Sequence, residues 1–204
     1  PEANGHTNFR DALDLISRAR RGVYVTFRNP DGRRLVHLAS RVQPSTPISH
    51  SVHSIGEASV DQPPAETPEP DVVLSPARFS ERVLYLRPHP GLDYDAIDLG
   101  RFDAVVHETY HSGTACTVGT GTNVLDFAGR CGAAGVPVFL GPVPDDVGTY
   151  ESATGFAAAR IIPFRRMLSE TAYVKVALGV GIGLVGDTLV DFVCRQELAG
   201  EFVR

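Results

Sequence analysis

A proline-rich segment near the middle of the chain is the strongest constraint on its fold. Residues 61–76 contain five prolines and four acidic residues, and they show no hydrophobic periodicity. Proline has no backbone N–H and a fixed φ, so neither a helix nor a central strand continues through such a stretch. The sequence therefore predicts two domains, residues 1–60 and 78–204, joined by a linker at 61–77.

The first predicted domain has too few elements to close a core of its own. Its apolar spacing predicts a helix over 8–21, strands over 23–27 and 35–39, and a turn over 29–32. Residues 43–56 are polar, and we expect His50 and His53 to lie in a solvated loop. One helix and one hairpin leave an exposed sheet edge, which predicts that a partner supplies the rest of the sheet.

Strands and helices alternate in the second predicted domain. The predicted strands cover 83–86, 104–106 and 136–140, and the predicted helices cover 94–99, 123–134, 170–178 and 187–194. We expect Thr122, Ser169 and Asp187 to cap the last three helices. Nearly continuous apolar strands indicate a parallel sheet covered on both faces. Ligands of such sheets bind at the carboxyl ends of the strands, so the loops 110–121 and 141–150 are expected to face one crevice.

The composition excludes several classes of partner. A net charge of −5 and a pI of about 5.8 predict no binding to nucleic acid or to an anionic membrane. The longest apolar run, 176–185, is too short to span a bilayer. Three cysteines without a C-x-x-C pair favour a reducing cytoplasm. A small polar ligand bound through local donors fits this composition best.

The segment 107–111 allows two incompatible interpretations. It spells H-E-x-x-H, in which two histidines one helical turn apart bind Zn²⁺ and the glutamate activates a metal-bound water. This zinc site requires a helix that continues past His111, but Ser112 and Gly113 follow at once. The other interpretation makes 104–106 a buried strand that runs into a loop rich in hydroxyl groups. The strand interpretation is preferred, and no metal or other cofactor is expected.

Several motifs, taken together and in order, give the chain a resemblance to bacterial-type L-asparaginases, in particular the cytoplasmic type and the D subunit of the archaeal glutamyl-tRNA amidotransferase. The matching segments are Asn4–Asn8, Leu86–Gly91, Tyr110–Thr114, Gly135–Val138, Tyr150–Gly155 and Met167–Ala172 with Lys175. The resemblance implies the C-terminal part of an asparaginase N-terminal domain over 1–60 and a Rossmann-like C-terminal domain with a short parallel sheet over 78–204. Thr114 stands where the family has asparagine, and Glu108 and His111 also depart from its pattern.

The resemblance also implies that this chain carries no catalytic residue. In asparaginases a threonine of a threonine-glycine-glycine-threonine turn attacks the side-chain amide, and a threonine-aspartate pair with a lysine partner assists it. None of these motifs occurs here, so the nucleophile would lie on another chain or segment. The substrate-binding residues implied for this chain are Tyr110, Ser112, Gly113, Thr114, Asp145 and Asp146.

The expected function is therefore one part of an amidohydrolase acting on asparagine or a related small carboxamide. We expect it in a homo- or hetero-oligomer in the cytoplasm, with an N-terminal catalytic chain or segment as partner. Two alternatives stay open. One is a non-catalytic asparaginase-like protein that binds a ligand or a partner, and the other is a zinc hydrolase that uses His107, Glu108 and His111.

Overall fold

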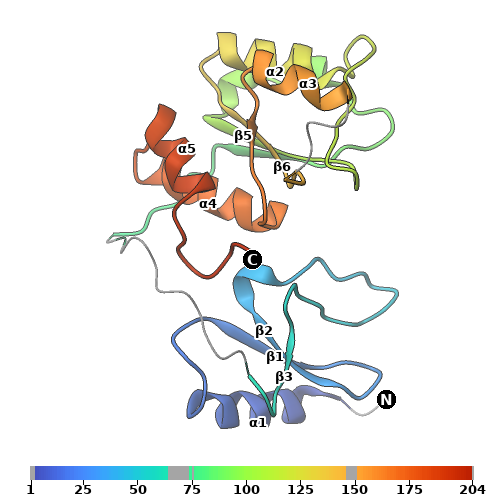
Figure 1. Ribbon diagram of the computed structural model, residues 1–204, viewed down its shortest axis with the longest axis vertical. Helices are drawn as coiled ribbons and strands as arrows, with labels where there is room; N and C mark the ends of the chain where they lie inside the picture. Colours follow the sequence, from blue (N-terminus) through green and yellow to red (C-terminus); the bar gives the residue numbers. More distant parts are fainter. Residues whose placement is uncertain (1–2, 64–73, 75, 146–150, 204) are drawn as a thin grey trace. The chain divides into compact units, whose positions relative to one another are not determined.

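A computed structural model describes residues 3–63, 74, 76–145 and 151–203 of the chain. The chain divides into two compact units (Figure 1). Unit 1 consists of Pro1–Val73 together with Glu197–Arg204, and unit 2 of Leu74–Gln196. The chain thus leaves unit 1 for unit 2 and returns to unit 1 with its last residues.

Unit 1 is built on a small antiparallel sheet with one helix along it (Figure 1). The elements are α1 (Gly5–Ile16), β1 (Tyr24–Arg28), β2 (Arg34–Leu38), the 3₁₀ turn η1 (Ala39–Arg41) and β3 (Ala58–Ser59), and the strand order is β1-β2-β3. The predicted turn joins β1 to β2, and Gly32 takes a φ of 87° there. Both predicted strands form within one residue of their expected bounds. The helix ends at Ile16 instead of residue 21.

The core of unit 1 lies between α1 and the sheet. Leu15, Val36 and Val60 are buried together, and a buried carboxylate, Asp11, accepts hydrogen bonds from the Arg34 guanidinium. Hydrogen bonds from η1 join the returning C-terminal segment to this unit. The Ser40 hydroxyl donates to the carbonyl of Ala199 at 2.7 Å, and the Arg41 guanidinium donates to the carbonyls of Gly200 and Phe202 at 2.6 and 2.8 Å.

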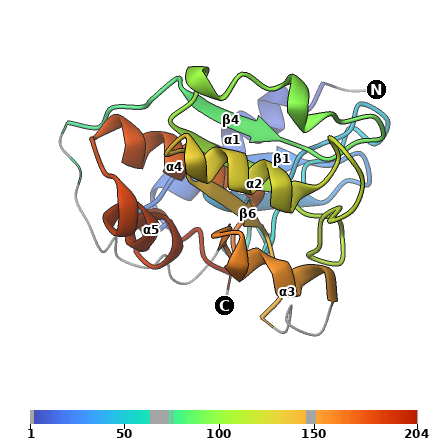
Figure 2. The ribbon, with the colours of Figure 1, turned by 90° about the horizontal axis from the view of Figure 1, so that it is seen from above.

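Unit 2 contains a four-stranded parallel sheet with helices on both faces (Figures 1 and 2). The strands are β4 (Val83–Leu86), β5 (Ala104–Glu108), β6 (Val138–Gly141) and β7 (Ile162–Pro163), and the helical elements are η2 (Tyr94–Ala96), η3 (Leu99–Arg101), α2 (Val124–Ala133), α3 (Glu151–Ala158), α4 (Ser169–Gly181) and α5 (Gly186–Cys194). The predicted α/β fold with a short parallel sheet is confirmed.

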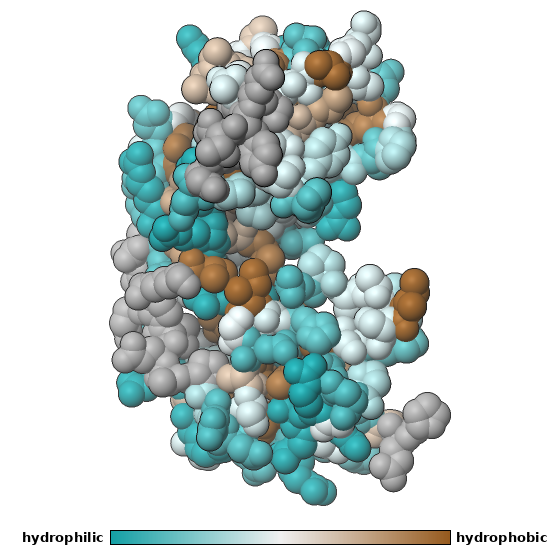
Figure 3. Space-filling view, turned by 45° about the vertical axis from the view of Figure 1, so that its right-hand side comes forward, coloured by the Kyte–Doolittle hydropathy of each residue, from teal (hydrophilic) through white to brown (hydrophobic). Residues whose placement is uncertain are grey.

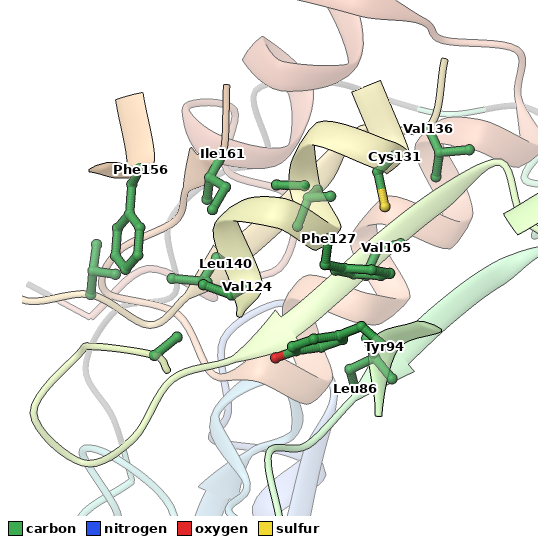
Figure 4. Packing of buried hydrophobic residues seen from close by; sticks show 14 residues of the cluster. Leu86, Tyr94, Val105, Val124, Phe127, Cys131, Val136, Leu140, Phe156 and Ile161 are labelled. Atoms are coloured by element: carbon green, nitrogen blue, oxygen red, sulfur yellow. The ribbon is translucent and has the colours of Figure 1, made fainter. Parts of the chain in front are cut away.

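Successive side chains of β5 point to opposite faces of the sheet, so each belongs to one of the two layers between the sheet and its helices. Val105 and His107 point to the face covered by α2 and α3, where Tyr94 stacks on Phe127 with ring centroids 4.6 Å apart (Figure 4). Glu108 points to the opposite face, which α4 covers. The first layer holds most of the apolar core of unit 2, including Leu86, Val124, Cys131, Val136, Leu140, Phe156 and Ile161.

The strand order of unit 2, β4-β5-β6-β7, is also the order of the strands along the chain. Doubly wound sheets bind ligands where the strand order reverses, and the described part of this sheet has no such reversal. Exposed apolar side chains lie in separate groups on the face shown in Figure 3. Among the described residues, no helix is long and apolar enough to cross a bilayer.

Candidate functional site

The candidate site lies where β5 ends and its chain folds back on itself. Tyr110 and Thr114 are joined by a backbone hydrogen bond of 2.8 Å from the Tyr110 N–H to the Thr114 carbonyl. The Gly113 N–H donates to the Tyr110 carbonyl, also at 2.8 Å. The two bonds close the segment 110–114 into a tight turn, called here the β5 turn. Four of the six residues predicted to bind substrate therefore lie within five positions of one ordered loop.

Gly113 is required in the β5 turn for two independent reasons. Its φ of 74° lies in the left-handed region, which side chains disfavour. A Cβ added there would also lie only 2.1 Å from Cδ of Pro144, in the loop that follows β6. The turn and the β6 loop meet again at Thr109, whose hydroxyl donates to the Pro142 carbonyl at 2.8 Å. The loops after β5 and β6 thus lie against each other, and the crevice expected between them stays a prediction.

The β5 turn presents an aromatic ring and two hydroxyl groups. Tyr110 is 45% exposed, and the side chains of Ser112 and Thr114 are partly exposed. The hydroxyl oxygens of Ser112 and Thr114 lie 2.9 Å apart and share a hydrogen bond. Neither hydroxyl contacts a histidine, lysine or carboxylate among the described residues, so no base is in place to activate it as a nucleophile. The turn can donate and accept hydrogen bonds to a polar ligand.

The two aspartates of the β6 loop differ in what the structure says of them. Asp145 pairs with the guanidinium of Arg166, with one N–O distance of 2.6 Å, and has Arg165 at 3.9 Å. Its carboxylate is engaged by these arginines, and no described contact brings it to the β5 turn. Asp146, like Tyr150, lies outside the described residues. Its assignment to the site stays a prediction.

Glu108 is the centre of a polar cluster that sequence reasoning missed. The Arg87 guanidinium donates two hydrogen bonds of 2.8 Å to its carboxylate, and the Tyr85 hydroxyl donates a third. Arg87 also reaches Glu170 of α4 at 3.1 Å. Burial raises the pKa of Glu108, but the hydrogen bonds from Arg87 and Tyr85 outweigh it and hold the pKa below its usual value. The cluster fixes the base of the β5 turn on α4.

The H-E-x-x-H segment does not form the helix that a zinc site of this type requires. His107 and Glu108 lie on β5, so their side chains point to opposite faces of the sheet. Both imidazole nitrogens of the fully buried His107 are engaged: Nδ1 donates to the Glu108 carbonyl at 2.5 Å, and Nε2 accepts from the Tyr94 hydroxyl at 2.7 Å. Burial lowers the pKa of His107, which favours this neutral form. The zinc-hydrolase alternative is therefore wrong for this geometry.

Comparison with solved structures identifies the fold of both units together. The whole chain aligns with the thermostable L-asparaginase from Thermococcus kodakarensis with a TM-score of 0.74 and 21% identity. It also aligns over its whole length with L-asparaginase I from Vibrio cholerae O1 biovar eltor, with a TM-score of 0.64 and 16% identity. The chain spans 64% of the length of each of these proteins.

Sequence comparison adds no family to this structural likeness. No protein-family model matches the sequence, and no curated protein matches it. At 21% and 16% identity the two solved structures establish the fold of the chain and not its activity. The conclusion from geometry and comparison together is that this chain has the fold of a large part of an L-asparaginase.

Proposed function

We propose that this chain is the C-terminal portion of an asparaginase-type amidohydrolase. One observation carries the proposal: the structural alignment with an L-asparaginase extends over the whole chain, with a TM-score of 0.74. The two asparaginases are longer than the stretch that aligns, and we assign the threonine nucleophile to that remaining part of the fold. In this assignment residues 1–60 complete an N-terminal domain, and residues 78–204 form the C-terminal domain.

The chemistry assigned to the whole protein is hydrolysis of a side-chain carboxamide. A threonine hydroxyl oxygen attacks the carbonyl carbon and passes its proton to a base, after which the C–N bond breaks and ammonia leaves with that proton. Water then attacks the resulting ester and releases the carboxylate. The β5 turn supports a role in holding the substrate, because Tyr110, Ser112 and Thr114 offer an exposed ring and hydroxyls on a loop fixed by Gly113.

The proposal is tested on the protein purified from its source under non-denaturing conditions, together with whatever chain is bound to it. Ammonia release from L-asparagine and from L-glutamine is measured for this preparation and for the 204-residue chain alone. We expect release from the preparation only. Asparagine that binds to the preparation without release of ammonia would instead identify a non-catalytic binding protein. A preparation that neither binds nor hydrolyses either amide would refute the proposal.

A matched pair of variants connects the activity to the β5 turn. Gly113→Ala introduces a Cβ against Pro144, whereas Gly135→Ala introduces one into open space at a similar φ of 73°. We expect Gly113→Ala to raise KM for the amide and Gly135→Ala to leave KM unchanged. Equal KM values for the two variants would remove the β5 turn from the proposed substrate site.

A further inference from the structure

Unit 1 contains a cavity that has no part in the function proposed above. It has a volume of about 750 Å³ and lies between the start of α1, the end of β1 and the loop 45–52. Pockets that hold small molecules have volumes of roughly 300–1,000 Å³, so this one has room for such a ligand.

Three hydrogen-bond donors of the cavity lining make no bond to the part of the chain that the structure describes. They are the Arg28 guanidinium, the Ser45 hydroxyl and the His50 imidazole, none of which has a hydrogen bond or ion pair to another described residue. The backbone of Arg28 is anchored, since its N–H donates to the Asn8 side chain at 2.8 Å and its carbonyl accepts from Asn4 at 3.1 Å. Arg28 therefore lies at the anchored end of β1, and the other two donors lie in the loop 45–52.

The charge around these donors favours an anion. None of the described residues that line the cavity is an aspartate or a glutamate. Two described acidic side chains close in sequence to the lining residues, Asp31 and Glu57, both pair with Arg33, at 2.7 and 3.6 Å. Arg28 is thus a cation without a protein counter-ion in the described structure, and a guanidinium binds carboxylate and phosphate groups through paired hydrogen bonds.

The loop that carries the other two donors is held in place. The buried side-chain amide of Asn29 binds the backbone of Val52 through two hydrogen bonds, of 3.0 and 2.9 Å. His50 has a φ of 51°, a left-handed conformation that a residue other than glycine rarely adopts. Such outliers concentrate at ligand sites. Phe27, Pro30 and Val52 also line the cavity and add apolar surface to it.

We propose that this cavity binds a small organic anion in which one carboxylate or phosphate group is attached to an apolar body. Arg28 binds the anionic group through its guanidinium, and Ser45 and His50 donate to the remaining oxygens. The apolar body lies against Phe27 and Val52. The proposal does not depend on the amidohydrolase function, because unit 1 supplies every residue of this site.

The test is a titration of the 204-residue chain with four probes, followed by two-dimensional ¹H–¹⁵N NMR. The probes are phenyl phosphate, benzoate, inorganic phosphate and benzamide, which has the ring of benzoate without its charge. We expect phenyl phosphate or benzoate to shift the amide signals of residues 45–52 and to bind at least about tenfold more tightly than benzamide. Tighter binding of one anion over the other identifies the ligand as a phosphate ester or a carboxylate. Inorganic phosphate, which lacks the ring, is expected to bind more weakly than phenyl phosphate, and equal affinity would overturn the apolar part of the proposal.

Variants separate this site from general attraction to a basic surface. Arg28→Gln removes the proposed anchor and should weaken binding about tenfold, whereas Arg10→Gln, the same change at an exposed position of α1, should have no effect. His50→Gly removes the imidazole at a φ that glycine accepts, so affinity should fall without loss of folding. Equal losses in Arg28→Gln and Arg10→Gln, or benzamide binding as tightly as benzoate, would overturn the proposal.

Discussion

Replacing Gly113 by alanine should destabilise unit 2 far more than the same change at Gly135. Both glycines have a positive φ, 74° and 73°, so alanine at either position loses about 1 kcal/mol through its backbone conformation. At Gly113 the new Cβ meets Cδ of Pro144 at 2.1 Å, whereas at Gly135 no atom of the described residues lies within 4 Å of it. Relief of that overlap requires the β6 loop to move, which typically costs about 1–3 kcal/mol. The expected loss of unfolding free energy is about 2–4 kcal/mol for Gly113→Ala and about 1 kcal/mol for Gly135→Ala.

Urea denaturation followed by tyrosine fluorescence measures this difference. The chain has no tryptophan, and five of its six tyrosines lie in unit 2, so the signal reports mainly on that unit. The midpoints are compared only if the wild type and both variants have the same m-value, because a changed m-value would indicate a change in the denatured state or a loss of two-state unfolding. Equal midpoints for the two variants would refute the reasoning, since they would show that Pro144 does not restrict the β5 turn.

Three further predictions follow from buried or paired groups of unit 2. Glu108 has a lower pKa in the folded than in the unfolded chain, so it stabilises above the unfolded pKa and loses this effect as the pH falls through the folded value. Urea denaturation at neutral pH and below pH 4.5 should show that acid lowers the unfolding free energy less in Glu108→Gln than in the wild type. An equal decrease in both proteins would contradict this. Tyr94→Phe leaves Nε2 of the buried His107 without a donor and should cost about 1–3 kcal/mol in the same melts, whereas exposed Tyr110→Phe should cost under about 0.5 kcal/mol. Burial raises the pKa of Cys131 to about 11, so mass spectrometry should find Cys131 unmodified after iodoacetamide treatment of the native protein at pH 8 and modified after denaturation.

The sequence predicts most strands of unit 2 because apolar runs and charged boundaries coincide there. The strand 83–86 forms with the expected bounds, between Arg82 and Arg87. The predicted helix at 94–99 becomes two 3₁₀ turns, because Asp93 and Asp98 each accept a hydrogen bond from a backbone N–H two residues later and start a new turn. The strand β7 has only two residues and includes Pro163, so its apolar signal is too short to detect.

Capping residues were predicted less well than the helices they precede. Asn123, and not Thr122, caps α2, while the Thr122 hydroxyl donates to the Val118 carbonyl at 2.9 Å. Ser169 is the first residue of α4, and its hydroxyl donates to the Gly141 carbonyl at 3.2 Å. The two hydroxyls thus bind carbonyls elsewhere, one in the loop before α2 and one at the end of β6. Local sequence favours several neighbouring polar residues as caps, and tertiary contacts decide among them.

The sequence predicted where the candidate site lies, but it did not predict the side-chain contacts that hold the site in place. Strand polarity alone brings the loop after β5 beside the loop after β6. The interpretation of 107–111 as a possible helix failed because a five-residue window fits both periods, and burial of His107 between Tyr94 and the sheet decided for the strand. The contacts of Arg87 with Glu108 and Glu170 join residues far apart in the sequence, and no local sequence pattern predicts them.

Because Glu197–Arg204 belong to unit 1, the two units are completed in a fixed order during synthesis. During synthesis the N-terminal residues leave the ribosome first, yet the hydrogen bonds from Ser40 and Arg41 have no acceptors until residues 199–202 have emerged. Unit 2 is contiguous in sequence and can close as soon as Gln196 is available. Unit 1, which is translated first, is thus completed last, because these hydrogen bonds form only after the whole of unit 2 has been synthesised.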